Sequence, residues 1–182
     1  MEFKAFVDGL MTFVRENQTY APFIVMLLAF GESLAFVSLI LPFWALLVGI
    51  GAIFGQASDF TFWAVLVAAA IGAGLGDWVS YWIGKHYHKQ IAGMWPLRNY
   101  PDLLPKGHRF FDKYGAWAIV LGRFSGPLRA SVPIVAGTVQ MHQPTFQLAN
   151  WSSAFLWAAV LMFFGDAIAR LLSHSSGLFG LQ

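Results

Sequence analysis

GESLAFVSLILP at residues 31–42 and GRFSGPLRASVP at residues 122–133 follow the same plan. In each stretch the first residue is a glycine, the second is charged and the last is a proline. The charged residues, Glu32 and Arg123, have opposite sign, and both lie in long apolar segments. The chain is therefore expected to contain two related halves, each organised around one charge and one break in a helix.

The composition predicts an integral membrane protein with a single domain. Of the 182 residues, 58% are hydrophobic and 11% are charged, whereas a soluble domain carries roughly 25% charged residues. The apolar runs exceed the roughly 18 residues that indicate a spanning segment, which disfavours a very apolar soluble core. The chain has no cysteine, which excludes disulfides and thiolate chemistry. The first 19 residues carry charges throughout, so we expect no cleavable signal peptide.

The first half begins with an amphipathic helix and a broken apolar run. Residues 1–18 place apolar side chains at helical spacing, which predicts a helix in the membrane interface. Residues 21–55 would extend about 50 Å as one helix, against a hydrocarbon core of about 30 Å, yet they are too short for two spans and a turn. A hairpin that enters and leaves on one side fits this length, with breaks at Gly31 and Pro42. Non-helical backbone at membrane depth must be buried or line a cavity.

A spanning helix and a basic loop follow. Residues 60–84 predict a transmembrane helix with small residues for close helix contact. Residues 85–113 hold six of the eleven basic residues and only two acidic ones. The positive-inside rule therefore predicts that this loop is cytoplasmic and that the turn at residues 56–59 lies outside. The same basic charges also suit binding of anionic lipid headgroups.

The second half repeats this order. Pro105 is expected to start a short amphipathic helix that ends near Tyr114. Residues 115–142 form a second broken run, and residues 145–169 a second spanning helix. Residues 173–182 are rich in Ser and Gly and are expected to be a frayed tail. The expected breaks in the second run are glycines and prolines, namely Gly126, Pro127, Pro133 and Gly137.

These segments predict an all-α membrane protein built as an inverted repeat of amphipathic helix, re-entrant helical hairpin and transmembrane helix. The first repeat covers residues 1–84, the basic cytoplasmic loop residues 85–104, the second repeat residues 105–172 and the tail residues 173–182. Because one spanning helix separates the repeats, the second is upside down relative to the first. Many secondary transporters share this plan and place their site where the broken helices meet.

Four charges in apolar stretches are the candidate transport residues: Glu32, Asp77, Arg123 and Arg129. An Arg, Lys or Asp at the bilayer centre costs about 2.5 to 3.5 kcal/mol, so such groups are usually paired or face water. A carboxylate in a low-dielectric site tends to take up a proton, which makes Glu32 a candidate for proton coupling. The two arginines suit a phosphate group, which a guanidinium binds through two hydrogen bonds. Two structural alternatives stay open: a Glu32–Arg123 pair that locks the hairpins together, and a position of Asp77 near the interface.

Three motifs between about residues 20 and 160 resemble the signature of one membrane-protein family. The longest runs from Gly122-Arg123-Phe124 through Pro127-x-Arg129 and Pro133-x-x-Ala136-Gly137 to Phe146 and Asn150-Trp151. The others are Gly76-Asp77-x-x-Ser80-Tyr81-x-x-Gly84, and Glu32 with Leu41-Pro42. Together they resemble the DedA family, also called the SNARE-associated or VTT-domain family.

The resemblance implies a lipid transporter, either a flippase or a scramblase, of the inner (cytoplasmic) membrane. Bacterial members of the family are implicated in recycling undecaprenyl phosphate, the carrier lipid of cell-envelope synthesis, and in moving phosphatidylethanolamine. Some of them depend on the proton motive force. By match, Glu32, Arg123 and Arg129 take the family's functional positions, and Asp77 takes the position in the Gly-Asp motif.

The chain departs from the family pattern in two places. The family often has Pro-Gly and then an acidic or small polar residue after the first hairpin, whereas here Phe43-Trp44 follows Pro42. Proton coupling therefore depends on Glu32 or Asp77. Many members also carry a further helix after the second spanning helix, whereas this sequence stops soon after it. A partner subunit of a homo-oligomer is a candidate to cover the surface that this helix would occupy.

Other function classes fit the sequence less well. A proton-coupled small-solute transporter or antiporter would use the same carboxylate but would not need two arginines in the second hairpin. An enzyme is not expected, because the five histidines lack a Ser or Asp partner at suggestive spacing and Ser125-Gly126 lacks the preceding glycine of a rhomboid-like protease. His86-x-His88 has no carboxylate at helical spacing, so no metal site is expected there. No other cofactor and no nucleic-acid partner is expected either. An insertion or assembly factor stays an open alternative.

The inverted-repeat topology predicts that a Ser58→Cys variant reacts with a membrane-impermeant thiol reagent added outside the cell. Because the chain has no cysteine of its own, the introduced thiol is the single reactive group. A His88→Cys variant in the basic loop is the control, and we expect it to react only after the membrane is opened. Labelling of residue 58 from the cytoplasmic side would contradict the topology.

Overall fold

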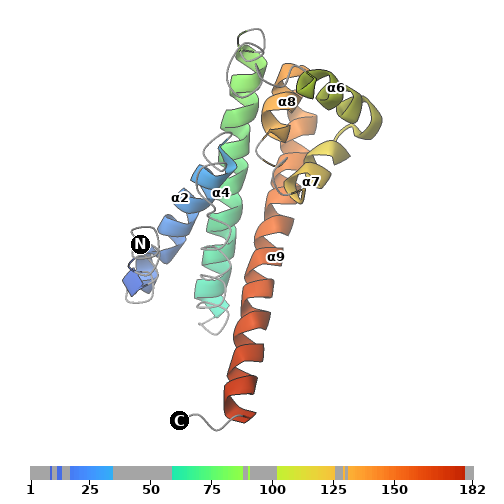
Figure 1. Ribbon diagram of the computed structural model, residues 1–182. Coiled ribbons are helices and arrows are strands. Elements are labelled where there is room, and N and C mark those ends of the chain that lie inside the picture. Colours follow the sequence, from blue (N-terminus) through green and yellow to red (C-terminus); the bar gives the residue numbers. More distant parts are fainter. Residues whose placement is uncertain are drawn as a thin grey trace.

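All regular elements in the described part of the chain are helical. The computed structural model describes residues 9, 12–13, 17–34, 59–87, 90, 102–125, 129 and 131–178. In chain order (Figure 1), the elements are the 3-10 helix η1 (Gln18–Tyr20) and the α-helices α2 (Ala21–Ser33), α4 (Asp59–His86), α6 (Leu103–Tyr114), α7 (Trp117–Arg123), α8 (Val132–Thr138) and α9 (Gln143–Leu178).

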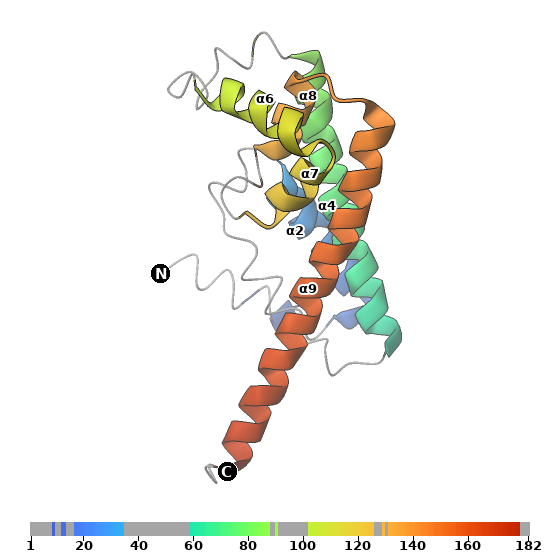
Figure 2. The same ribbon diagram turned by 90° about the vertical axis from the view of Figure 1, so that its right-hand side faces the viewer.

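Two long apolar helices, α4 and α9, run side by side through the molecule (Figures 1 and 2). Residues Phe60–His86 and Gln143–Ala167 are each long and apolar enough to cross a membrane, in agreement with the two expected spanning helices. The helices are antiparallel, because Tyr81 stacks on Phe146 at 4.1 Å between ring centroids, and Leu66 shares a cluster with Met162. This supports the expected class, an all-helical membrane protein.

The expected tail at residues 173–182 is wrong over most of its length, because α9 continues to Leu178. Serine and glycine lower helix propensity by at most about 1 kcal/mol per residue. Extension of a helix that is already formed tolerates this cost, so serine and glycine residues alone do not end α9.

The helices α2 and α8 pack closely on α4 at successive levels along its length. Gly72 and Gly76 are four residues apart and lie on one side of the helix, whereas Gly84 is twelve residues from Gly72 and lies about a third of a turn further round. A Cβ atom on Gly72 would lie 2.1 Å from the carbonyl oxygen of Met26 in α2, and one on Gly84 would lie 2.2 Å from that of Ile134 in α8. These backbones approach so closely because glycine has no side chain, as is common between membrane helices.

The first broken run enters the molecule in the same direction as α4 (Figure 1). Met26 of α2 lies against Gly72, and the Ser80 hydroxyl donates to the Ser33 carbonyl oxygen at 3.4 Å. The first residue of α4 is Asp59, about 30 Å from Ser80 at 1.5 Å per residue. The chain must therefore return over this distance between Ser33 and Asp59.

The expected break at Gly31 is wrong, because α2 is helical through Ser33. A glycine costs a helix interior only about 1 kcal/mol relative to alanine, and packing of α2 on α4 offsets this cost. The expected breaks at Pro42, Gly126 and Pro127 lie outside the described residues. So does most of the expected interfacial helix at residues 1–18.

The second broken run consists of two short helices, α7 and α8, separated by residues 124–131. Pro133 lies in the first turn of α8, where a backbone N–H would have no partner within the helix, so proline is tolerated there. Pro133 therefore marks the start of this helix. Gly137 lies in the last turn. The expected amphipathic helix is confirmed as α6, and Gly115, with a φ of 54°, turns the chain from α6 into α7.

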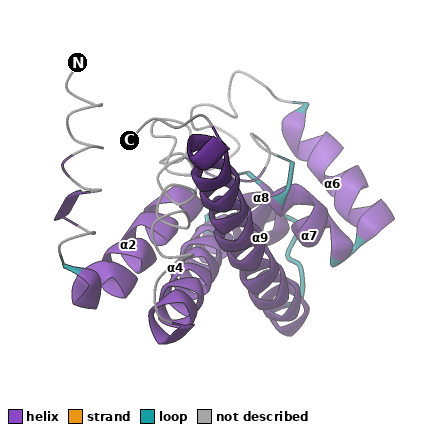
Figure 3. Ribbon diagram, turned by 90° about the horizontal axis from the view of Figure 1, so that it is seen from below, coloured by secondary structure: helices purple, strands orange, loops and turns teal. Residues whose placement is uncertain are grey.

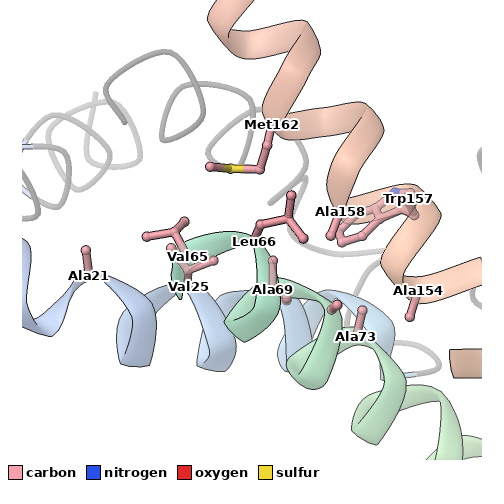
Figure 4. Close-up of a cluster of buried hydrophobic side chains, with 12 residues drawn as sticks. Ala21, Val25, Val65, Leu66, Ala69, Ala73, Ala154, Trp157, Ala158 and Met162 are labelled. Atoms are coloured by element: carbon pink, nitrogen blue, oxygen red, sulfur yellow. The ribbon is translucent and has the colours of Figure 1, made fainter. Parts of the chain in front are cut away.

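Two apolar clusters surround the centre of the molecule. In Figure 3, α2 lies on one side of the α4–α9 pair, and α6, α7 and α8 lie on the other. The α2-side cluster (Figure 4) joins α2, α4 and α9 and consists of Ala21, Val25, Ala29, Val65, Leu66, Ala69, Ala70, Ala73, Ala154, Trp157, Ala158 and Met162. The α8-side cluster consists of Tyr81, Phe111, Ala118, Ile119, Val132, Ile134, Val135, Ala136, Phe146 and Ala149.

Exposed tryptophans near both ends of α4 indicate where the membrane boundaries lie. Trp63 and Trp82 are about half exposed, and tryptophan is enriched at both membrane interfaces. They are nineteen residues apart, or about 28 Å along a helix. This distance agrees with a hydrocarbon core of about 30 Å.

We expect Gly137→Ala to lower the free energy of unfolding by about 1–3 kcal/mol, the usual cost of overpacking. Its Cβ atom would lie 2.2 Å from the carbonyl oxygen of Tyr81 and 2.6 Å from the backbone nitrogen of Lys85. Thermal unfolding in detergent measures the change. Gly9→Ala is the control, because a Cβ atom there meets nothing within 4 Å. Equal unfolding temperatures for the two variants would contradict the close packing of α8 on α4.

Candidate functional site: two buried ion pairs

Asp77 of α4 and Arg123 of α7 form a buried ion pair. Each residue is only 3% exposed, and the Nη2 group of Arg123 donates to Oδ2 of Asp77. Arg123 is the last residue of α7, so the pair ties the end of this short helix to a spanning helix.

The spanning helix α9 completes the surroundings of Arg123. Nε of Arg123 donates to Oγ of Ser153 at 3.0 Å, and Nη2 donates to Oδ1 of Asn150 at 2.7 Å. Nδ2 of Asn150 in turn donates to the carbonyl oxygen of Gly74 at 2.9 Å, which fixes the amide against α4. A buried charge needs both a counter-ion and further hydrogen bonds, and Arg123 has both.

A second ion pair, between Glu32 and Arg129, connects the two broken runs directly. Nη1 of Arg129 donates to Oε1 of Glu32 at 2.7 Å, and Nη2 donates to Oγ of Ser33 at 3.0 Å. The side chain of Glu32 is 5% exposed and that of Arg129 is 11% exposed. Ser33 is also fastened to α4 through the Ser80 hydroxyl. The last turn of α2 therefore holds Arg129 and is itself held by α4.

Trp157 of α9 supports the second pair. The Cζ atom of Arg129 lies 4.7 Å from the centroid of the Trp157 ring, within range of a cation–π interaction. Trp157 is buried in the α2-side cluster. The guanidinium group is thus held between an aromatic face and a carboxylate.

The two ion pairs belong to one layer of charge. Arg129 lies close enough to interact electrostatically with both Asp77 and Arg123. Trp157, which supports Arg129, belongs to the α2-side cluster, whereas Tyr81, one turn of α4 from Asp77, belongs to the α8-side cluster. The charged layer therefore lies between the two apolar clusters.

The structure brings all four predicted site residues together but pairs them differently from one sequence-based alternative. The expected Glu32–Arg123 pair is wrong, because Arg123 pairs with Asp77 and Glu32 pairs with Arg129. Asp77 is almost completely buried within the protein. Glu32 and Arg123 hold matching positions in their motifs. The two broken runs nevertheless meet α4 at different levels, and this difference decides which residues pair.

Sequence reasoning did not assign three residues that contact the arginines: Asn150, Ser153 and Trp157. Asn150 and Ser153 are polar residues three positions apart in a mainly apolar spanning helix, which also carries Ser152. That spacing places them on one face of a helix, and it is the signal in the sequence by which they could have been found. Trp157 had no comparable signal, because a tryptophan in a membrane helix usually serves packing or anchoring.

Each charged residue of the layer has one buried polar atom without a hydrogen-bond partner among the described residues. These atoms are Oε2 of Glu32, Oδ1 of Asp77, Nη1 of Arg123 and Nε of Arg129. Buried polar groups are nearly always hydrogen-bonded. The layer therefore has spare donors on its arginines and spare acceptors on its carboxylates.

The described residues offer no place for a metal ion. Within the described ranges, no group of three or more His, Cys, Asp or Glu side chains lies together. The two carboxylates of the charged layer are each engaged by an arginine instead.

Two apolar helices that are long enough to span a membrane, with two ion pairs beside them, fit an integral membrane protein. A family model described as the VTT domain matches residues 41–167. The chain therefore belongs to the VTT-domain (DedA) family, which confirms the resemblance seen in its motifs.

Several relatives are similar to the chain over most of its length. Inner membrane protein YabI of Escherichia coli (strain K12) is 36% identical over 145 residues, which cover 80% of this chain and 57% of YabI. The uncharacterized membrane protein BU139 of Buchnera aphidicola subsp. Acyrthosiphon pisum is 32% identical, with 92% of this chain and 66% of BU139 covered. Inner membrane protein YqjA of E. coli (strain K12) is 28% identical, with 81% of this chain and 67% of YqjA covered.

The chain thus spans less than two thirds of the length of YabI and BU139. No solved structure matches it significantly. Two of the three relatives are named inner membrane proteins, which supports a membrane location.

We expect Arg123→Leu to destabilise the protein by about 3–5 kcal/mol, the usual cost of leaving one partner of a buried ion pair unpaired. The double variant Asp77→Leu/Arg123→Leu should be less destabilised than Arg123→Leu alone, because it leaves no uncompensated charge. Unfolding in detergent measures both. Arg109→Leu, at an exposed position of α6, is the control. A loss for Arg123→Leu no larger than that of the control would contradict a buried, paired Arg123.

Proposed function

We propose that this protein is a lipid transporter that moves a phosphate-bearing lipid across the membrane through the charged layer. One observation carries the proposal: Arg123 is buried and Arg129 partly buried between the apolar clusters, and each has a guanidinium N–H without a partner among the described residues. A phosphate group supplies several acceptor oxygens, and guanidinium groups bind them with charge-assisted hydrogen bonds. The acyl or prenyl tail would stay in the bilayer.

The two arginines have different roles in this proposal. Arg123 is held by Asp77, Asn150 and Ser153 on two spanning helices and serves as a fixed positive charge. Arg129 is more exposed and is held by Glu32 and Ser33 at the end of α2. Arg129 is therefore the arginine that exchanges its carboxylate for the phosphate of the lipid.

Proton uptake by Glu32 would control this exchange. A neutral carboxyl group attracts a guanidinium far less than a carboxylate does, so protonation of Glu32 releases Arg129 to bind phosphate. Loss of the proton restores the Glu32–Arg129 pair and expels the phosphate. In this scheme Trp157 keeps the guanidinium group in place while its partner changes.

We further propose that the two broken runs are an inverted pair of re-entrant hairpins. The direction of α2 along α4 supports this proposal, because the chain returns toward Asp59 after Ser33. The other run starts from α6, reaches Arg123 beside Asp77, and returns with Gln140 donating to the carbonyl oxygen of Lys85 at 3.0 Å. Two hairpins that enter from opposite ends and meet at a charged layer suit alternating access.

The family resemblance suggests the lipid. Undecaprenyl phosphate and phosphatidylethanolamine both carry a phosphate group that the two arginines would bind. The charged layer does not select a tail, since it contacts the headgroup alone in this proposal. The proposed location is the inner membrane, with the basic loop at residues 85–113 in the cytoplasm.

A proton-coupled small-solute transporter is the second candidate. It is favoured by the two carboxylate oxygens, on Glu32 and Asp77, that lack partners among the described residues. These oxygens suit a protonated or cationic solute rather than an anion. The two candidates differ in whether lipid moves.

Lipid movement in reconstituted vesicles tests the proposal. Vesicles are prepared with a fluorescent phospholipid, and its appearance in the opposite leaflet is measured with and without a pH gradient. We expect Arg129→Ala to slow transport at least about tenfold, which corresponds to about 1.4 kcal/mol. Glu32→Gln should slow transport and should no longer respond to the pH gradient, because its side chain does not titrate and cannot displace the phosphate from Arg129.

His142→Ala is the control, because His142 is exposed and lies outside both the charged layer and α6. Equal lipid movement with and without the wild-type protein would contradict lipid transport. Solute-dependent proton movement by that same sample would then favour the second candidate. A Glu32→Gln variant that still responds to pH would contradict only the proton exchange at Glu32.

A further inference from the structure

The helix α6 carries a stripe of three cations, Lys106, Arg109 and Lys113, here called the α6 basic stripe. The three residues are spaced at i, i+3 and i+7, which places them along one side of an α-helix. All three are exposed. The stripe is thus a continuous positive surface about two turns long.

The opposite side of α6 faces the protein. A Cβ atom on Gly107 would lie 2.5 Å from Cγ1 of Val135 in α8, so the two helices are in close contact there. Phe111 is buried in the α8-side cluster. Packing on α8 therefore fixes which side of α6 is turned outward.

Within the described part of the chain, no carboxylate forms a salt bridge with the α6 basic stripe, although the exposed Asp102 lies one turn before Lys106. Both salt bridges among the described residues lie in the charged layer. Nε of Arg109 donates to the carbonyl oxygen of Pro105, and Lys113 lies over the ring of Tyr114, so neither meets a counter-ion. Asp112, the one acid within α6, is exposed beside the stripe.

The position of α6 brings this stripe to the level of lipid headgroups. Figure 2 shows α6 lying across the long axis of α4 and α9, near the end of α4. Large aromatic side chains are exposed at this end, including Trp82, Tyr87 and Trp117. Exposed Trp and Tyr of membrane proteins typically lie at the headgroup level. A helix lying across the spanning helices at that level runs along the membrane surface.

We propose that the α6 basic stripe docks on anionic lipid headgroups of the membrane surface and thereby holds α6, and α8 beneath it, at the interface. Each Lys or Arg near an anionic surface contributes about fivefold to such binding. The attraction falls off within a Debye length, about 8 Å at physiological ionic strength, so it is sensitive to salt. This docking does not depend on the proposed transport of lipid through the charged layer.

A fluorescent label at residue 105 tests the docking in the full chain. Pro105 is exposed beside the stripe, and because the chain has no cysteine, Pro105→Cys gives a single labelling site. The labelled protein is reconstituted in vesicles of phosphatidylcholine alone and in vesicles that also contain phosphatidylglycerol. We expect the label to be protected from the neutral quencher acrylamide severalfold more in the anionic vesicles, and high salt should remove this extra protection.

Two variants in the labelled background separate docking from other effects. Replacement of Lys106, Arg109 and Lys113 by Gln should abolish the extra protection while the unfolding temperature stays unchanged. Asp112→Asn is the matched control and should keep or increase the protection, because it removes a negative charge from the same helix. Equal protection in both kinds of vesicle, or undiminished protection in the triple variant, would overturn the proposal. None of these readouts measures transport, so failure here leaves the proposed function untouched.

Discussion

The cost of placing charge inside an apolar membrane segment governs this structure. Each acid of the first half is matched by an arginine from the second half, Asp77 by Arg123 and Glu32 by Arg129. A single unpaired ion in such surroundings costs several kcal/mol. Neither half can therefore bury its charges without the other, and the charged layer fixes how the two halves meet.

Close backbone contact on α4 makes this meeting possible. Lipid tails are as apolar as the side chains that replace them, so membrane helices associate through close packing and hydrogen bonds. Gly72 lets α2 approach the backbone of α4 closely, and Gly84 with Gly137 lets α8 do so at a further level along α4. The ends of both elements are then near enough for long arginine side chains to reach the carboxylates.

The elements were easier to predict from the sequence than their partners. Long apolar runs predicted α4 and α9, and the amphipathic pattern after Pro105 predicted α6. The four charges also stood out, because charge is rare in apolar segments. The pairing of these charges could not be predicted from the sequence. Glu32 and Arg123 hold equivalent motif positions, which suggested that they pair, but α2 and α7 meet α4 at different levels and Asp77 lies beside Arg123. Gly31 was misjudged for a similar reason, since tertiary packing keeps it helical.

The charged layer lies off-centre between the two tryptophan levels of α4, and this position has an electrical consequence. Asp77 is five residues from Trp82 and fourteen from Trp63, or about 8 and 21 Å along the helix. A unit charge that reaches the layer from the Trp63 side crosses about three quarters of the transmembrane voltage, equivalent to about 1.7 kcal/mol per 100 mV. From the Trp82 side it crosses about one quarter. In the proposed transport, voltage would therefore act mainly on exchange with the Trp63 side, whereas exchange with the Trp82 side would respond mainly to concentration.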